Sequence, residues 1–139
     1  MRSNLNIIYN NLNQNHKFLI ASKGIEKTSG KRLSEVLTEE ITFIKEKNIS
    51  ILSGPNLAKE IYENKTTSTV IASKNFSLLN NIKTVIESNK FKIYLSDDTI
   101  GVELGGALKN IVTLGAGICD GLNIGNNLKG AFISIAFSE

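Results

Sequence analysis

One lysine, Lys109, lies among glycines and aliphatic residues in the segment GVELGGALKN. On a helix, Lys109 shares one face with Gly105, Val112 and Ala116, at spacings of four, three and four residues. Loss of hydration in such surroundings disfavours the charged form of a lysine, which can then exchange a proton near neutral pH. The sequence therefore indicates Lys109 as a candidate acid or base. The alternative is a surface lysine that ends a helical turn.

Two shorter segments place further polar groups directly after predicted strands. In ASKG, Lys23 follows an apolar run, and in LSGPNLAKE, Gly54, Asn56 and Ala58 follow another and open a helix. Ligands of α/β enzymes bind beyond the carboxyl ends of the strands. Free backbone N–H groups at a helix start also favour an anion. Each segment alone is more typical of an ordinary turn or of a solvated lysine, so the predicted site depends on all three segments occurring in this order.

The elements that must position these residues alternate along the first part of the chain. Short apolar runs predict strands over residues 18–21, 49–52, 69–72 and 91–95, and apolar residues at helical spacing predict helices between them. One of these helices, carrying Leu33 to Ile44, starts near residue 31, another takes Pro55 at its first position, and a third is capped by Ser77.

Beyond residue 98 the pattern changes. Eight of the eleven glycines lie between Gly101 and Gly130, yet the apolar residues keep helical spacing. The run Leu128–Phe137 is apolar almost all round, which predicts a helix buried among partners. We therefore expect two regions: an α/β region over residues 1–98 and the start of an all-α region over residues 99–139.

The expected regions look like parts of something larger. The α/β region opens on a helix with no strand before it, so a first βαβ unit is missing from the pattern. The all-α region ends on an apolar helix. An uncovered sheet edge and an exposed apolar helix both favour association.

Composition excludes several classes of function. The 139 residues suit one ordinary domain, and a net charge of +3 with dispersed lysines argues against nucleic acid or an anionic membrane as partner. The single cysteine, Cys119, cannot form an internal disulfide, which suits a reducing cytoplasm, and its apolar surroundings predict burial. The single histidine, His16, is predicted in a solvated loop, so no metal site is expected. Neither a signal peptide nor a segment of membrane-span length is expected.

The three segments ASKGIE, LSGPNLAKE and DDTIGVELGGALKN closely resemble the bacterial type of NAD(P)-dependent glycerol-3-phosphate dehydrogenase. The continuation LGAGICDGLNIGNNLKGAFI is also similar, so the resemblance extends from about Phe18 onward. It implies the latter part of a Rossmann-like domain followed by the first helices of a helical domain like that of 6-phosphogluconate dehydrogenase. The implied reaction is hydride transfer from NADH or NADPH to dihydroxyacetone phosphate, giving sn-glycerol 3-phosphate for phospholipid synthesis.

The resemblance also implies roles for individual residues. Lys109 would be the catalytic acid/base and would also contact the substrate, and Lys23 would contact both cofactor and substrate. Gly54 and Asn56 match positions that contact the substrate, and Ala58 matches one that contacts the cofactor. The family usually carries Ser or Thr where this chain has Asn56, which puts that contact in doubt.

Two departures from the family bear on activity. No G-x-G-x-x-G follows an opening strand, so the cradle for the dinucleotide pyrophosphate is missing. The family's later helical segment, with further substrate and cofactor residues, would lie beyond Glu139. We therefore expect the isolated chain to be inactive, and a complementing chain or a homodimer is a possible partner. The alternatives are a non-enzymatic remnant or partner-binding module, and another dehydrogenase of the β-hydroxyacid group.

Overall fold

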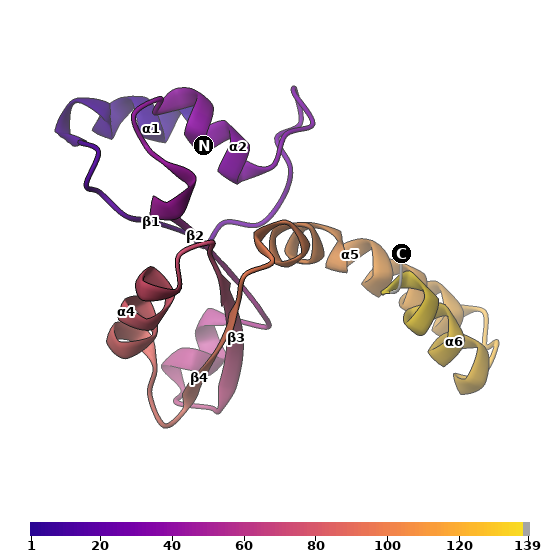
Figure 1. Ribbon diagram of the computed structural model, residues 1–139. Helices are drawn as coiled ribbons and strands as arrows, with labels where there is room; N and C mark the ends of the chain where they lie inside the picture. Colours follow the sequence, from indigo (N-terminus) through magenta and orange to yellow (C-terminus); the bar gives the residue numbers. More distant parts are fainter. Residues whose placement is uncertain (138–139) are drawn as a thin grey trace. The chain divides into compact units, whose positions relative to one another are not determined.

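The computed structural model describes residues 1–137, which form a four-stranded sheet with helices (Figure 1). The elements in chain order are α1 (Arg2–Ile8), η1 (Tyr9–Asn11), β1 (Phe18–Ile20), α2 (Leu33–Glu40), η2 (Glu46–Asn48), β2 (Ile49–Ser53), α3 (Ala58–Tyr62), β3 (Thr67–Ala72), α4 (Phe76–Ile86), β4 (Phe91–Ser96), α5 (Thr99–Gly121) and α6 (Asn126–Ala136). All four predicted strands are present. The chain divides into two compact units, Met1–Gly106 and Ala107–Glu139, whose boundary lies inside α5. The sequence pattern had suggested a boundary at residue 98, and residues 138–139 of the expected second region lie outside the described range.

The sheet is mixed, with strand order β1-β2-β3-β4. β1 pairs with β2 and β3 with β4 in parallel, whereas β2 and β3 are antiparallel, with Ile51 opposite Ala72. The carboxyl ends of β1 and β2 therefore lie at one end of the sheet, and those of β3 and β4 at the other. The segment that joins β2 to β3 contains only the five-residue helix α3, which is too short to return along the strands as the helix of a parallel crossover does.

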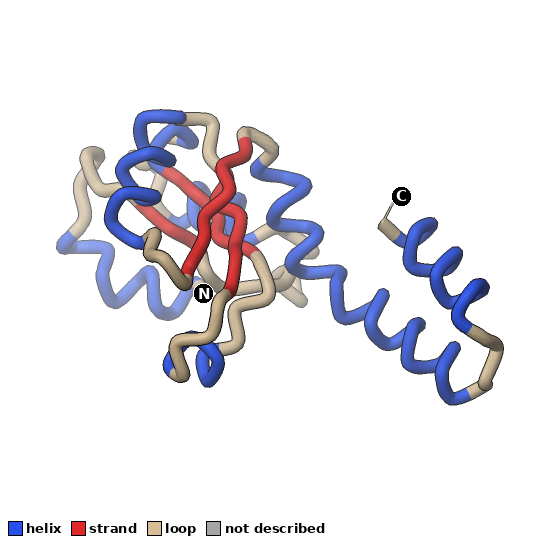
Figure 2. The backbone as a smooth tube through the Cα atoms, turned by 90° about the horizontal axis from the view of Figure 1, so that it is seen from below, coloured by secondary structure: helices blue, strands red, loops and turns tan. Residues whose placement is uncertain are grey.

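Helices cover both faces of the sheet, shown in red in Figure 2. Side chains alternate between the faces of a strand. Ile51 accordingly packs with Leu37 of α2 on one face, and its neighbour Leu52 packs beside Leu79 of α4 on the other. α1 lies beside α2 and completes the first of these two cores with Leu5.

Three helix boundaries differ from the predictions. α2 starts at Leu33 and ends at Glu40, because Ile41 leaves helical geometry; Ile41 and Ile44 then enter the core from the following turn. Pro55 lies in the loop before α3, which starts only at Ala58. α4 is capped by Asn75, whose Oδ1 accepts from the Leu78 N–H at 3.2 Å, and Ser77 lies inside the helix.

The second unit contains the rest of α5 and α6. Gly115 faces the ring of Phe132, which would collide with any β-carbon at that position, and Lys129 forms an ion pair with Asp120 at 2.8 Å. None of the described residues 107–137 is buried. The predicted burial of the closing helix is therefore not found in this chain, and Cys119 is only half-buried.

α5 corrects one further expectation. With 23 residues it is long and apolar enough to cross a membrane by length and composition, although no segment of that length was expected. A single helix of this kind is weak evidence for a membrane span, because core helices of other proteins meet the same two criteria.

Candidate active site

The loops after β1 and β2 meet at the carboxyl ends of these strands, as the motifs ASKG and LSGPN predicted. The exposed side chain of Lys23 donates from Nζ to the Gly54 carbonyl oxygen at 2.6 Å. The backbone N–H of Asn56 donates to the same oxygen at 2.9 Å. One carbonyl thus holds the lysine of the first loop and the turn of the second in fixed positions.

Gly54 lies too close to β3 for any side chain. A β-carbon there would lie 2.9 Å from both Cα and Oγ1 of Thr69. The Thr69 hydroxyl donates to the Ser53 carbonyl oxygen at 3.0 Å, and Thr69 Oγ1 itself accepts from the Asn56 side-chain amide at 3.0 Å. Asn56 therefore directs its amide nitrogen toward Thr69 of β3 and ties the loop to that strand. Its Oδ1 is buried without a hydrogen-bond partner among the described residues.

The first turns of α5 run along the sheet from the amino end of β2 to this site. A β-carbon on Gly106 would lie 2.5 Å from Ser53 Oγ and 3.7 Å from Lys23 Cγ. Gly105 has open space at the corresponding point. Gly106, the third glycine of GVELGGALKN, therefore allows α5 to approach both loops, which gives a structural reason for that part of the motif.

Glu103 is a second anchor of α5 that the sequence analysis did not single out. Its side chain is buried, with 5% of the residue exposed, and accepts hydrogen bonds from the Ser34 backbone N–H at 2.9 Å and hydroxyl at 2.6 Å. Arg32 lies 3.5 Å from the same carboxylate. Because the Ser34 N–H belongs to the first turn of α2 and has no partner within that helix, Glu103 joins α5 to the start of α2.

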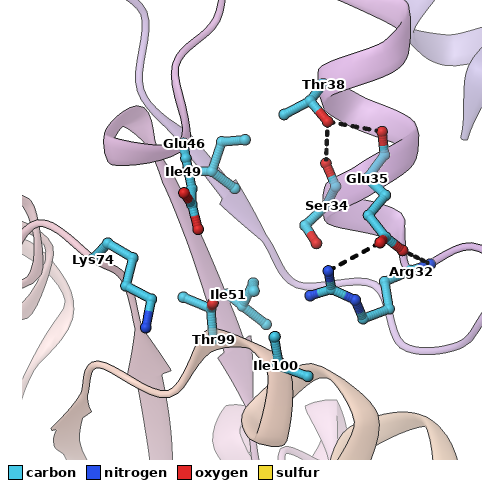
Figure 3. Close-up of a pocket in the computed structure, with 10 residues that line it drawn as sticks. All are labelled: Arg32, Ser34, Glu35, Thr38, Glu46, Ile49, Ile51, Lys74, Thr99 and Ile100. Atoms are coloured by element: carbon cyan, nitrogen blue, oxygen red, sulfur yellow. Dashed lines mark hydrogen bonds and ion pairs between the residues drawn. The ribbon is translucent and has the colours of Figure 1, made fainter.

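A cavity of about 270 Å³ lies at the opposite end of β2, between α2 and the start of α5 (Figure 3). Arg32 turns toward Glu35 with an ion pair of 3.1 Å, and Lys74 lies on the other side of the cavity. The Arg32 backbone N–H and guanidinium hold the pKa of Glu35 below its ordinary value. The Arg32 guanidinium already forms ion pairs with Glu35 and Glu103. Lys74 is the other cationic residue that lines this cavity.

The structure thus brings together three of the predicted site residues, Lys23, Gly54 and Asn56. Ala58 is the exposed first residue of α3. α3 has only five residues, so the expected anion site at its start is not supported. Lys109 is exposed, contrary to the expected loss of hydration, and its carbonyl accepts from the Thr113 hydroxyl at 2.9 Å.

Comparison with known proteins connects these residues to a family. Residues 1–79 match the model of the NAD-dependent glycerol-3-phosphate dehydrogenase N-terminus, and residues 98–139 match that of the C-terminus. A glycerol-3-phosphate dehydrogenase (NAD(P)+) of Dehalococcoides mccartyi is 44% identical over all 139 residues, which are 39% of its length. One from Oceanobacillus iheyensis is 45% identical over 86% of this chain and 34% of its own length. The chain therefore spans about two-fifths of the curated relatives it matches.

Solved structures give the same result. The glycerol-3-phosphate dehydrogenase of Coxiella burnetii superimposes with a TM-score of 0.82 at 30% identity, over 97% of this chain and 40% of that one. The enzyme of Plasmodium falciparum gives 0.84 at 32% identity, over 96% and 37%. The expected fold class, a Rossmann-like α/β part followed by the first helices of a helical domain, is confirmed. The chain belongs to the NAD-dependent glycerol-3-phosphate dehydrogenase family.

Proposed function

We propose that this chain supplies part of the active site for hydride transfer between NAD(P)H and dihydroxyacetone phosphate, giving sn-glycerol 3-phosphate for phospholipid synthesis in the cytoplasm. The observation that carries the proposal is the meeting of two family motifs at the Gly54 carbonyl, which accepts from both Lys23 and Asn56. A ligand beyond the strand ends would lie beside these loops.

The residues of these two loops are chemically suited to some of the contacts that the substrate and the cofactor need. The exposed Lys23 ammonium is positively charged and is held at the loop after β2 by its 2.6 Å hydrogen bond to the Gly54 carbonyl oxygen. Lys23 is thus chemically suited to a substrate phosphate or to an oxygen of the cofactor. Gly54 and Asn56 would shape the substrate side of the loop, and Ala58 would border the cofactor. The Asn56 amide already donates to Thr69, so we assign Asn56 a role in holding the loop as well as in substrate contact.

Lys109 is the proposed acid/base. The nicotinamide, when bound, supplies the hydride. Lys109 Nζ would give a proton to the forming alkoxide oxygen during reduction, and would accept it in the reverse direction. A lysine does this near neutral pH only when its charged form loses hydration. Because Lys109 is exposed in this chain, the role requires a further segment that covers it.

We propose that the parts of the relatives that these 139 residues do not span, on the same or on a complementing chain, supply this cover and the dinucleotide cradle, since the 139 residues contain no G-x-G-x-x-G. A homodimer would bring a second copy of the same residues but no such cradle. Cofactor and substrate must be held together at reacting distance for hydride transfer. The chain alone should therefore show no NAD(P)H-dependent reduction of dihydroxyacetone phosphate.

Complementation tests the function. The Dehalococcoides mccartyi relative would be expressed without the 39% of its length that aligns with this chain, and mixed with this chain. Oxidation of NADH and of NADPH in the presence of dihydroxyacetone phosphate would then be followed. We expect activity only in the mixture, and a loss of about 10²–10⁴-fold with Lys109→Met. Lys90→Met, at an exposed position before β4, is the matched control and should keep full activity. Activity of the chain alone, or equal activity of both variants, would contradict the proposal.

A further inference from the structure

The cavity between α2 and the start of α5 lies at a second set of carboxyl ends of strands. Because β2 and β3 are antiparallel, β3 and β4 end at the opposite end of the sheet from Lys23 and Gly54. Lys74 follows β3, Thr99 follows β4, and both line this cavity of about 270 Å³ (Figure 3). Ligands of α/β folds bind beyond the carboxyl ends of the strands. The sheet therefore offers a second place for a ligand, apart from the Lys23 loop.

Thr99 carries a hydroxyl group that the described part of the chain leaves without a partner. The residue is only 9% exposed, and its side chain points from the start of α5 into the cavity (Figure 3). The other two hydroxyls of the lining are already used: that of Ser34 donates to Glu103 at 2.6 Å and that of Thr38 to a backbone carbonyl at 2.9 Å. No hydrogen bond joins the Thr99 hydroxyl to any residue in the described range. A buried hydroxyl without a partner costs free energy, which a ligand that accepts from it recovers.

Two opposite charges of the lining, Glu46 and Lys74, are also unpaired. Glu46 belongs to η2 and Lys74 to the loop after β3, and within residues 1–137 neither side chain forms a hydrogen bond or an ion pair. The two segments are joined to each other, because Asn75 Nδ2 donates to the Lys47 carbonyl oxygen at 3.1 Å. Both charges are therefore held at one cavity by the backbone that carries them.

The remaining residues of the lining are either apolar or already paired. Arg32 and Glu35 form an ion pair of 3.1 Å with each other, so together they add no net charge. Ile49 and Ile51 are buried residues of the lining, whereas Ile100 is 52% exposed. The cavity thus offers one free charge of each sign, one free hydroxyl and an apolar side chain that lacks cover.

We propose that this cavity binds a small zwitterion, an α-amino acid with an apolar side chain. Its carboxylate would accept hydrogen bonds from Lys74 Nζ and the Thr99 hydroxyl. Its ammonium group would donate to the Glu46 carboxylate, and its side chain would cover Ile100. An ion with a single charge would leave either Lys74 or Glu46 unpaired. The volume of about 270 Å³ is at the small end of ligand pockets, which begin at roughly 300 Å³, and so suits a ligand of this size.

Three related molecules separate the contributions of the two charges. L-leucine carries both charges, isocaproate lacks the ammonium group, and isoamylamine lacks the carboxylate. Each would be titrated at neutral pH into the unmodified chain, and binding would be followed by the NMR shifts of backbone amides. We expect leucine to bind about ten-fold tighter than either of the others, because each of these loses a hydrogen bond to a charged group, with the largest shifts at Thr99 and Ile100. Equal binding of leucine and isocaproate, shifts confined to other residues, or no binding of leucine would overturn the inference.

Three substitutions and a control test the residues themselves. Thr99→Val, Lys74→Gln and Glu46→Gln should each weaken leucine binding by about ten-fold. Lys47→Gln changes an exposed neighbour of Glu46 that does not line this cavity, and it should leave leucine binding unchanged. Without leucine, Thr99→Val should unfold at the same or a higher temperature, since its hydroxyl has no partner in the described range. A lower unfolding temperature would assign that hydroxyl a structural role and overturn the inference, as would equal leucine binding by Lys47→Gln and the other variants. None of these measurements involves dihydroxyacetone phosphate or NAD(P)H, so their outcome is independent of the proposed function.

Discussion

The two units of the chain contain similar apolar patterns, but only the first buries them. In Met1–Gly106, Leu37, Ile41, Ile71 and Leu79 are fully buried in the cores on the two faces of the sheet. In the described part of the second unit no residue is buried. A sheet gives each helix a surface to pack against, whereas a pair of helices can cover only one stripe of each other.

α5 shows the same contrast within one helix. Before the unit boundary, Glu103 and Gly106 are buried in contacts with α2 and with the loops after β1 and β2. Beyond the boundary, Ile111 and Leu114 are 65% and 68% exposed. Apolar spacing thus predicts which face of a helix is to be covered, but not whether the same chain covers it.

The largest effect should come from removing a side chain of the first core. Leu37→Ala deletes a fully buried side chain of α2, which costs about 2–5 kcal/mol of unfolding free energy. Leu114→Ala, at a position that is 68% exposed, should change it by less than about 0.5 kcal/mol. Urea unfolding followed by circular dichroism measures both. Similar losses for the two variants would show that the second unit also has a core of its own.

The strands could be predicted from the sequence because each contains a short, mostly apolar run between turn signals. The meeting of Lys23 with Gly54 could also be foreseen, since both follow parallel strands. The antiparallel pairing of β2 and β3 was missed, although the apolar helical pattern between them is short for the helix of a parallel crossover. Predicted helix starts were less accurate, because Pro55 and Ser77 suit a loop or a first turn as well as a cap.

The hydrogen-bond partners of Glu103 could not be predicted from the sequence. A lone carboxylate in an apolar helix indicates that a partner is needed, but Ser34 and Arg32 lie 69 and 71 residues away in the chain. Burial of Lys109 was wrongly predicted for a related reason. The small neighbours that were expected to shield its side chain share its helix, and shielding needs atoms from another element.

A smaller effect is expected at the two adjacent glycines of α5. Gly105→Ala should raise the unfolding free energy by about 0.5–1 kcal/mol, because alanine favours a helix and its β-carbon meets open space. Gly106→Ala gains the same helix propensity, but its β-carbon would clash with Ser53 Oγ. This clash should lower the unfolding free energy by about 1–3 kcal/mol. Thermal unfolding compares the two. Ser53→Ala in the Gly106→Ala background removes the hydroxyl and should restore part of the loss; no restoration would locate the strain elsewhere.

The smallest effect concerns an ion cluster at the surface of the first unit, where Arg2 pairs with Glu26, Glu39 and Glu40 at 2.6–3.0 Å. Hydrogen bonds from Arg2 and then Ser29 lower the pKa of Glu26 from 4.5 to about 2. Between these values the unfolded chain takes up a proton that the folded chain does not. The contribution of Glu26 is therefore complete above about pH 4.5 and is lost as the pH falls toward 2.

Arg2→Gln removes this coupling and should flatten the dependence of the urea midpoint on pH between 4.5 and 2, so that variant and unmodified chain converge near pH 2. The difference at pH 7 should be slight, because the Arg2 side chain is 35% exposed and solvent screens the charges. Lys129→Gln deletes the ion pair with Asp120 in the second unit and should leave the midpoint of the first unit unchanged. Parallel pH curves for Arg2→Gln and the unmodified chain would show that Arg2 does not lower the pKa of Glu26 on folding. A shifted midpoint with Lys129→Gln would mean that the two units unfold together. We expect no shift, because all buried side chains of the described residues lie in the first unit.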